Sequence, residues 1–101
     1  MSAASTPPPV LRLAARDEVA VALRRLAPGT PLDPVAPGVS VREPIELGHK
    51  VALLPIAEGA LVHKFGVPIG RATRPIAPGE HVHVHNLESL VLKNAVDHAE
   101  D

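Results

Sequence analysis

A seven-residue pattern recurs along the chain and limits the folds that it can adopt. An aliphatic residue, two others, glycine, two others and a second aliphatic residue occur in Leu26–Leu32, Ile45–Val51, Ile56–Val62 and Ile76–Val82. Glycine closes a turn by taking a positive φ, and the outer aliphatic residues are typical of strand ends. Prolines in or beside these segments exclude helices through them. Because the spacing between copies is unequal, the pattern predicts one small all-β body of short strands rather than a solenoid.

The core of such a body must be aliphatic. The chain has 101 residues, enough for one domain, and 46% of them are hydrophobic. Trp and Tyr are absent and Phe65 is the only aromatic residue, so Leu, Val, Ile and Ala must fill the interior. Small cores of this kind often gain stability by association. We therefore expect a partner surface, and self-association into a homo-oligomer is compatible with it.

The pattern also sets the expected boundaries. Residues 1–9 are small, polar and rich in proline, and we expect a disordered leader there. The domain should occupy residues 10–90, followed by a frayed acidic tail over residues 91–101. The segment 87–101 has the apolar spacing of a short amphipathic helix. Asp17–Leu23 fits either a helix capped by its aspartate or a strand, and the adjoining repeat favours the strand.

Charge and composition exclude several classes of protein. The formal net charge is −1 and the ten basic residues are scattered, so nucleic-acid binding is not expected. With no cysteine, the chain can form neither a disulfide nor a thiolate metal site. The sequence has neither a secretory signal pattern nor an apolar run of membrane-spanning length, so we expect a cytoplasmic protein with no membrane contact.

Histidines alternate with valines near the end of the expected domain. The run is His81, Val82, His83, Val84 and His85. Successive side chains of an extended strand point to opposite faces, so the three imidazoles should share one face and the valines the other. Imidazoles at alternate positions can chelate one ion or bind substrate oxygens, which makes His83 and His85 candidate metal ligands. Alternatively, the histidines only form the exposed face of a strand whose valines are buried.

Two further candidates, His49 and Lys50, follow the turn glycine Gly48. The lysine could hold a substrate carboxylate as a point charge. The alternative is a solvated turn that leads into the buried strand Val51–Leu54. Lys64 has the same two interpretations.

Four blocks in order give the chain a family resemblance. It resembles the SAF domain of altronate and galactarate dehydratases, which forms their N-terminal part or a separate small subunit, as in sulfolactate sulfo-lyase. The blocks are Asp17–Leu23, Gly48–Leu53, Lys64–Thr73 and Gly79–Asn86. The resemblance implies a β-clip fold. Two positions depart from the family pattern, with Phe65 where Tyr is frequent and Glu18 where Asn is usual.

The resemblance also implies a function, that of the small subunit of a lyase. A separate large catalytic subunit would be its partner, and a sugar acid or another 2-hydroxy acid its substrate. Elimination needs a base, with an acid or a Lewis-acidic metal for the leaving group. The family is associated with divalent iron or manganese, held mainly by the large subunit. His83, His49 and Lys50 are the expected catalytic residues. His83 and His85 are the expected metal ligands. The resemblance does not decide whether water or sulfite is eliminated. An alternative function is that of a stand-alone SAF module that binds a sugar acid or serves in assembly.

Overall fold

The structure is a computed structural model of the whole chain, and it describes residues 8–90. The regular elements in this range are short strands, which confirms the all-β prediction. They are β1 (Val10–Leu11), β2 (Val19–Ala22), β3 (Lys50–Ala52), β4 (Leu61–Lys64), β5 (Val67–Ala72), β6 (His81–Val82) and β7 (Leu87–Ser89). Within residues 8–90 no helix has the length and apolar character needed to cross a bilayer.

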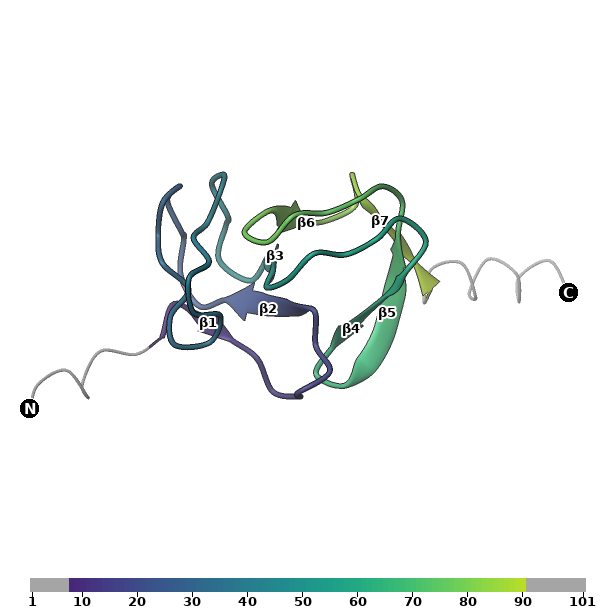
Figure 1. Cartoon of the computed structure of the whole chain (residues 1–101), viewed down its shortest axis with the longest axis horizontal. Helices are drawn as coiled ribbons and strands as arrows, with labels where there is room; N and C mark the ends of the chain where they lie inside the picture. The colour runs from purple at the N-terminus through teal and green to yellow at the C-terminus, as the bar shows by residue number, and fades with distance from the viewer. Residues whose placement is uncertain (1–7, 91–101) are drawn as a thin grey trace, which may run out of the picture.

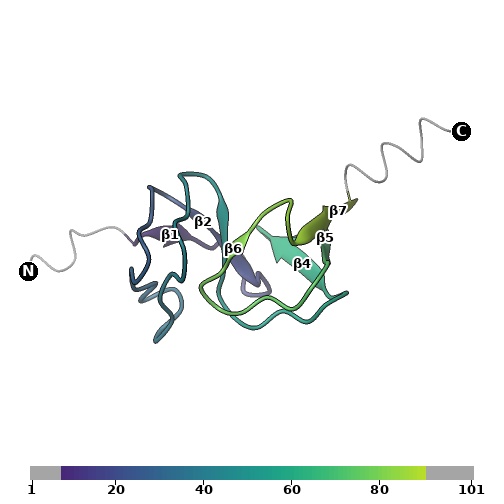
Figure 2. The ribbon, with the colours of Figure 1, turned by 90° about the horizontal axis from the view of Figure 1, so that it is seen from above.

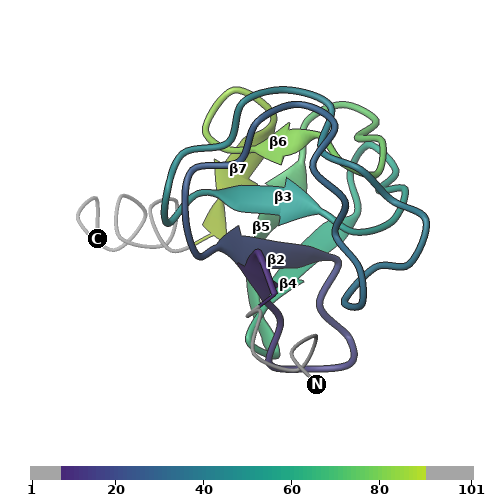
Figure 3. The same ribbon diagram turned by 90° about the vertical axis from the view of Figure 1, so that its left-hand side faces the viewer.

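The strands form two small antiparallel sheets (Figure 1). The first has the order β1-β2-β3-β6 and the second the order β4-β5-β7. Figure 3 shows β2, β3 and β6 side by side, with β4, β5 and β7 behind them. Strands far apart in the sequence thus become neighbours, and the pairing of β3 with β6 joins segments about thirty residues apart. This pairing is the one that assembles the candidate site.

The repeated pattern forms the turns that it predicts. The four glycines have φ angles of +90° at Gly29, +83° at Gly48, +85° at Gly59 and +88° at Gly79. In every copy the residue after the glycine donates a backbone hydrogen bond to the residue three positions earlier, as Glu80 does to the Ala77 carbonyl at 3.1 Å. All eight outer aliphatic residues are buried: Leu26, Leu32, Ile45, Val51, Ile56, Val62, Ile76 and Val82.

Buried side chains form two clusters, one on each face of the first sheet. The cluster on one face joins Ala20 and Val51 to residues of the long loops over residues 26–45. The cluster on the other face joins Val19 and Val82 to the second sheet, where Val62 is fully buried. Figure 2 shows these loops and the second sheet at opposite ends of the described domain. The first sheet is therefore the central layer, and both of its faces are covered.

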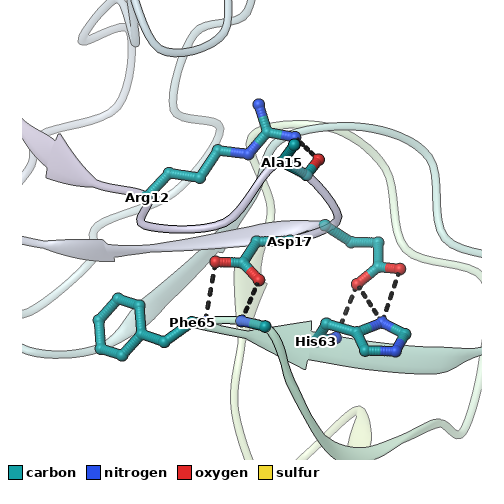
Figure 4. Close-up of polar contacts among 7 residues, drawn as sticks. Arg12, Ala15, Asp17, His63 and Phe65 are labelled. Atoms are coloured by element: carbon teal, nitrogen blue, oxygen red, sulfur yellow. Dashed lines mark hydrogen bonds and ion pairs between the residues drawn. The ribbon is translucent and has the colours of Figure 1, made fainter.

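A buried carboxylate fixes the β4–β5 hairpin to the first sheet (Figure 4). Asp17, at 0% exposure, accepts hydrogen bonds from the amides of Phe65 and Gly66, each at 2.8 Å. Both residues have positive φ, 55° and 81°, as a two-residue hairpin loop requires. Burial opposes ionisation, but hydrogen bonds from Gly66, Phe65 and Ala14 outweigh it, so the pKa of Asp17 lies below its ordinary value. Because Phe65 contributes its backbone amide, this contact needs no tyrosine hydroxyl.

The structure also corrects one expectation near the end of the domain. Residues 87–89, the start of the segment in which the apolar spacing placed a helix, form β7 and pair with β5, and residues 91–101 of that segment lie outside the described residues. Packing decides here, because Leu87 lies against the cluster between the two sheets. The strand expected within Asp17–Leu23 is confirmed as β2, and no helix is capped by Asp17. The expected leader (1–9) and tail (91–101) fall largely outside the described residues.

Candidate functional site

The histidine run turns away from the sheet after two residues. The strand predicted over His81–His85 ends at Val82, and a turn follows. The buried side chain of Asn86 makes this turn, since its Oδ1 accepts from the amide of His83 and its Nδ2 donates to the carbonyl of His81, both at 2.9 Å. The two valines therefore do not share one buried face, contrary to prediction. Val82 is fully buried, and Val84 is 82% exposed.

Strand pairing brings a fourth histidine to the run. In the ladder between β3 and β6, Lys50 is opposite Val82 and Val51 is opposite His81. One step further along the same register places His49 opposite His83, with both side chains on the face of His81. The ring centroids of His49 and His83 are 4.5 Å apart and their planes differ by 11°. The sequence singled out both residues, and the register explains why they meet.

His81 completes a compact group of three imidazoles, here called the histidine cluster: His49, His81 and His83. One ring nitrogen from each lies within 4.8 Å of the others. Nδ1 of His49 and Nε2 of His81 are 2.9 Å apart, so one of them donates a hydrogen bond to the other. His85 lies outside this group but beside it, with its ring 5.3 Å from that of His81 and tilted by 39°.

The environment favours the neutral forms of His81 and His83, because it lowers the pKa of both. Burial lowers the pKa of His81, and the neighbouring imidazoles lower it further against a smaller opposing effect of Glu43. Burial also lowers the pKa of His83, with nearby imidazoles and the ammonium group of Lys50 acting in the same direction. Neutral imidazoles have free lone pairs. The rings can therefore accept a proton or bind a metal ion at neutral pH.

A small hollow opens beside the histidine cluster, between the two sheets. Its volume is about 210 Å³, and the polar residues that line it are Lys50, Lys64, His83 and Ser89. Its apolar lining comes from Ile69, Val84 and Leu87. Burial lowers the pKa of Lys50, and the like charge of Lys64 lowers it further. Two ammonium groups and an imidazole in one hollow favour an anionic ligand of modest size.

Comparison with known proteins places the chain in a family. The profile of the altronate/galactarate dehydratase SAF domain matches residues 8–90, the whole described range. The chain belongs to this family. An altronate dehydratase from Escherichia coli (strain K12) is 49% identical over 76 residues, which are 75% of this chain and 15% of the relative. One from Bacillus subtilis (strain 168) is 38% identical over 79 residues, 78% of this chain and 16% of the relative.

A shorter relative also matches this SAF domain. The (2R)-sulfolactate sulfo-lyase subunit alpha of Chromohalobacter salexigens is 47% identical over 49 residues, 48% of this chain and 52% of the relative. The domain thus spans about a sixth of the altronate dehydratases and about half of the sulfo-lyase subunit. Its relatives are lyases and dehydratases, which bears out the resemblance seen in the sequence.

The donor set of the SAF domain suits some metals better than others. Imidazole is a good ligand for divalent iron and zinc, whereas manganese favours carboxylate and water oxygens. No carboxylate joins the group of potential ligands that the histidine cluster forms among residues 8–90. The cluster therefore fits iron and does not by itself fit manganese. His49, His81 and His83 would hold such an ion, which would supply Lewis acidity when bound.

Sequence reasoning singled out most of this site but ranked some of its residues low. His83, His49 and Lys50 converge at the junction of the histidine cluster and the hollow. Lys64 was given less weight, yet it lines the same hollow. Alternation along the run suggested His83 and His85 as the metal ligands, and His81 was not among them. Only the pairing of β3 with β6 reveals that His81 lies nearer to His49.

One histidine belongs to another contact altogether. His63 binds Glu18 through its backbone amide at 2.6 Å and through Nδ1 at 3.1 Å (Figure 4). The β4–β5 register shifts between Val62 and His63, where this amide turns to the glutamate. Glu18, a departure from the family pattern, thus adds a second link between the first sheet and β4. Its role is structural, and His63 serves below as a control for the histidine cluster.

Proposed function

We propose that this SAF domain is the small component of a hydro-lyase that acts on a sugar acid or a related 2-hydroxy acid. A separate large catalytic subunit would complete the site. The observation that carries the proposal is the convergence of Lys50, Lys64 and neutral His83 on one hollow. The names of the relatives support it, since two are altronate dehydratases and one is a sulfo-lyase subunit.

The two lysines would bind the substrate carboxylate. Lys50 comes from β3 of the first sheet and Lys64 from β4 of the second, so the two charges approach the hollow from different layers. Burial lowers the pKa of Lys50, and the like charge of Lys64 lowers it further. A bound carboxylate would attract both ammonium groups and reduce their mutual repulsion.

His83 would move the proton. In β-elimination a base removes the proton from the carbon next to the carboxylate, the C–H electron pair forms the double bond, and hydroxide leaves the adjacent carbon. His83 is neutral and can accept a proton, and the turn held by Asn86 fixes the position of its backbone. A divalent ion, iron or manganese held mainly by the large subunit, would assist the departing hydroxide as a Lewis acid. We infer that His83 and His85 would be the side chains of this chain nearest to that ion.

Exposed apolar side chains at this end of the domain support a docked partner. Val84, between His83 and His85, is 82% exposed, and Leu47, two residues before His49, is 65% exposed. A partner that packs against Val84 would remove this apolar side chain from water, which favours association. A large subunit seated on Val84 would close the hollow and exclude water from the reaction.

Reconstitution tests this proposal. The complete chain, used as bait in an extract of its own source, should retain a larger lyase subunit. The purified pair should eliminate water from a sugar acid, or sulfite from a sulfolactate, at a rate that neither component reaches alone. His83→Gln should abolish that rate while leaving the pair associated. A large subunit that is fully active without this chain would contradict a catalytic share.

A second function is favoured by one observation. Lys50, Lys64 and His83 of this domain already line one hollow, and an acid ligand could use these groups. The SAF domain would then be a stand-alone sugar-acid binder, or an assembly module that uses the same surface. Calorimetry with the isolated chain and a panel of sugar acids separates the two. Binding by the isolated chain, with no partner retained by the bait, favours this second function.

A further inference from the structure

The histidine cluster has features of a metal site that the hollow does not share. We propose that His49, His81 and His83 bind one divalent transition-metal ion of intermediate softness, of the class of Zn²⁺ or Fe²⁺, within this chain alone. The inference needs no large subunit and does not rest on the proposed function. It is an alternative to that function at His83, because an imidazole bound to an ion cannot also accept the substrate proton. It also replaces the ligand pair that the sequence suggested, because His49 and His81 take the place of His85.

The spacing of the first two nitrogens matches a shared ion. Two imidazole nitrogens bound to one ion at about 2.1 Å are about 3.0 to 3.4 Å apart. Nδ1 of His49 and Nε2 of His81 are 2.9 Å apart without an ion, where a proton holds them together. An ion can therefore replace that proton with little movement of either ring.

The third ligand is close. A ring nitrogen of His83 lies within 4.8 Å of the other two. The His83 ring is nearly parallel to those of His49 and His81, with interplanar angles of 11° and 12°. Because parallel rings do not direct their lone pairs to one point, the His83 ring must rotate when the ion binds. Three protein ligands leave at least one coordination position for water or another ligand, as in catalytic rather than structural zinc sites.

The backbone under the cluster is rigid. His81 is in β6, paired with the central β3, and the His81 amide donates to a Glu43 carboxylate oxygen at 3.0 Å. The His49 amide closes the Gly48 turn, and Asn86 holds the backbone of His83. Ligands placed by paired strands and a fixed turn lose little freedom when an ion binds. The site is thus built in advance of its metal.

Nearby charges act in opposite directions on a bound cation. The carboxylate of Glu43 lies beside His81 and would attract the cation. The ammonium group of Lys50 lies beside His83 and would repel the cation. The site therefore differs from an all-protein structural cage, and we expect reversible binding that a chelator removes.

Zinc titration of the complete, tag-free chain tests the proposal. After treatment with a chelator, the chain should bind one Zn²⁺ in calorimetry at pH 7.5. The ring ¹⁵N resonances of His49, His81 and His83 should shift, while those of His63 should not, because His63 is held by Glu18. This measurement uses the unmodified chain, so it does not depend on the folding of any variant.

Variants then assign the ligands. His49→Gln and His81→Gln should each weaken zinc binding by about 100-fold or more, since loss of even an outer partner of a ligand costs roughly 10–100-fold. His63→Gln and His85→Gln are matched controls and should bind as the parent chain does. The proposal is overturned if the parent chain binds no zinc, or if His85→Gln abolishes binding while His49→Gln does not. Unchanged circular dichroism of each variant confirms that it is folded.

Discussion

Gly79 offers a stringent test of the turn geometry that supports the site. It precedes β6 by two residues, and its amide donates to the Ala52 carbonyl at 2.8 Å while its carbonyl accepts from the Arg42 amide at 2.9 Å. A Cβ added there would lie 2.1 Å from the backbone oxygen of Ser40. Gly59 occupies the same place in another copy of the turn and has nothing within 4 Å of an added Cβ. The two glycines therefore differ in crowding but not in φ.

The structure sets the size of the effect. An L-residue in a left-handed conformation costs about 1–2 kcal/mol, and both substitutions to alanine incur it, because φ is +88° at Gly79 and +85° at Gly59. Gly79→Ala must also move backbone, and forced overpacking adds about 1–3 kcal/mol. We therefore expect Gly59→Ala to lose about 1–2 kcal/mol and Gly79→Ala about 2–5 kcal/mol of the free energy of unfolding.

Urea denaturation followed by far-UV circular dichroism measures this difference. Fluorescence is unsuited, because the chain has neither Trp nor Tyr. For a domain of this size each kcal/mol shifts the melting temperature by about 4–8 °C, so thermal unfolding gives a second reading. Equal losses in Gly59→Ala and Gly79→Ala would refute the close approach of Ser40 to Gly79, and with it the placement of β6 against the loop.

Three further predictions concern the groups around the site. Asp17→Asn should lose about 2–4 kcal/mol at pH 7, because each buried amide left unpaired costs about 1–3 kcal/mol. The folded-state pKa of Asp17 is lowered from 3.8, so the stability that its carboxylate contributes is present above pH 3.8 and is lost as pH falls through the folded-state pKa. The urea midpoints of variant and parent should therefore converge at low pH. A difference that stays constant with pH would contradict an ionised Asp17. Lys50→Gln should raise the KM for an acid substrate of the reconstituted pair about tenfold or more, and an unchanged KM would show that the lysine does not bind the anion. As pH rises, the parent pair should lose affinity for the acid at a lower pH than a lysine with the ordinary pKa of 10.5 would allow, because the pKa of Lys50 is lowered. Asn86→Ala should cost about 1–3 kcal/mol in urea and weaken zinc binding through His81 and His83, and full zinc affinity in a folded Asn86→Ala would show that the turn does not position them.

The sequence predicted the fold through its turns. Glycine recurs at the third position of these tight turns because it can take a positive φ without a steric penalty. The aliphatic residues before and after each glycine were therefore expected to be buried. All of them are, from Leu26 to Val82. What the pattern could not supply is the end of each strand, because side-chain contacts decide it. Asn86 ends β6 after Val82, and packing of Leu87 between the sheets makes residues 87–89 a strand, β7, where the apolar spacing predicted the start of a helix.

The candidate site was predictable in its residues but not in its grouping. Alternation placed His81 and His83 on one face, and they do lie together. His49 stood out only because it follows a turn glycine. That it meets Nε2 of His81 depends on the register between strands whose residues are far apart in sequence, and register follows from the complete packing of both sheets. The pairing of Lys50 with Lys64 across the hollow likewise follows from packing of one sheet on the other.

The most direct test of the account is the elimination rate of the partner lyase with and without this chain. We predict that the large subunit alone is nearly inactive on its acid substrate, that the complete chain restores the rate, and that His83→Gln does not. Arg74→Gln, an exposed substitution away from the hollow, should restore the rate as well as the parent chain does. Equal rates with the parent chain and with His83→Gln, in pairs shown to be associated, would contradict a catalytic role for this domain.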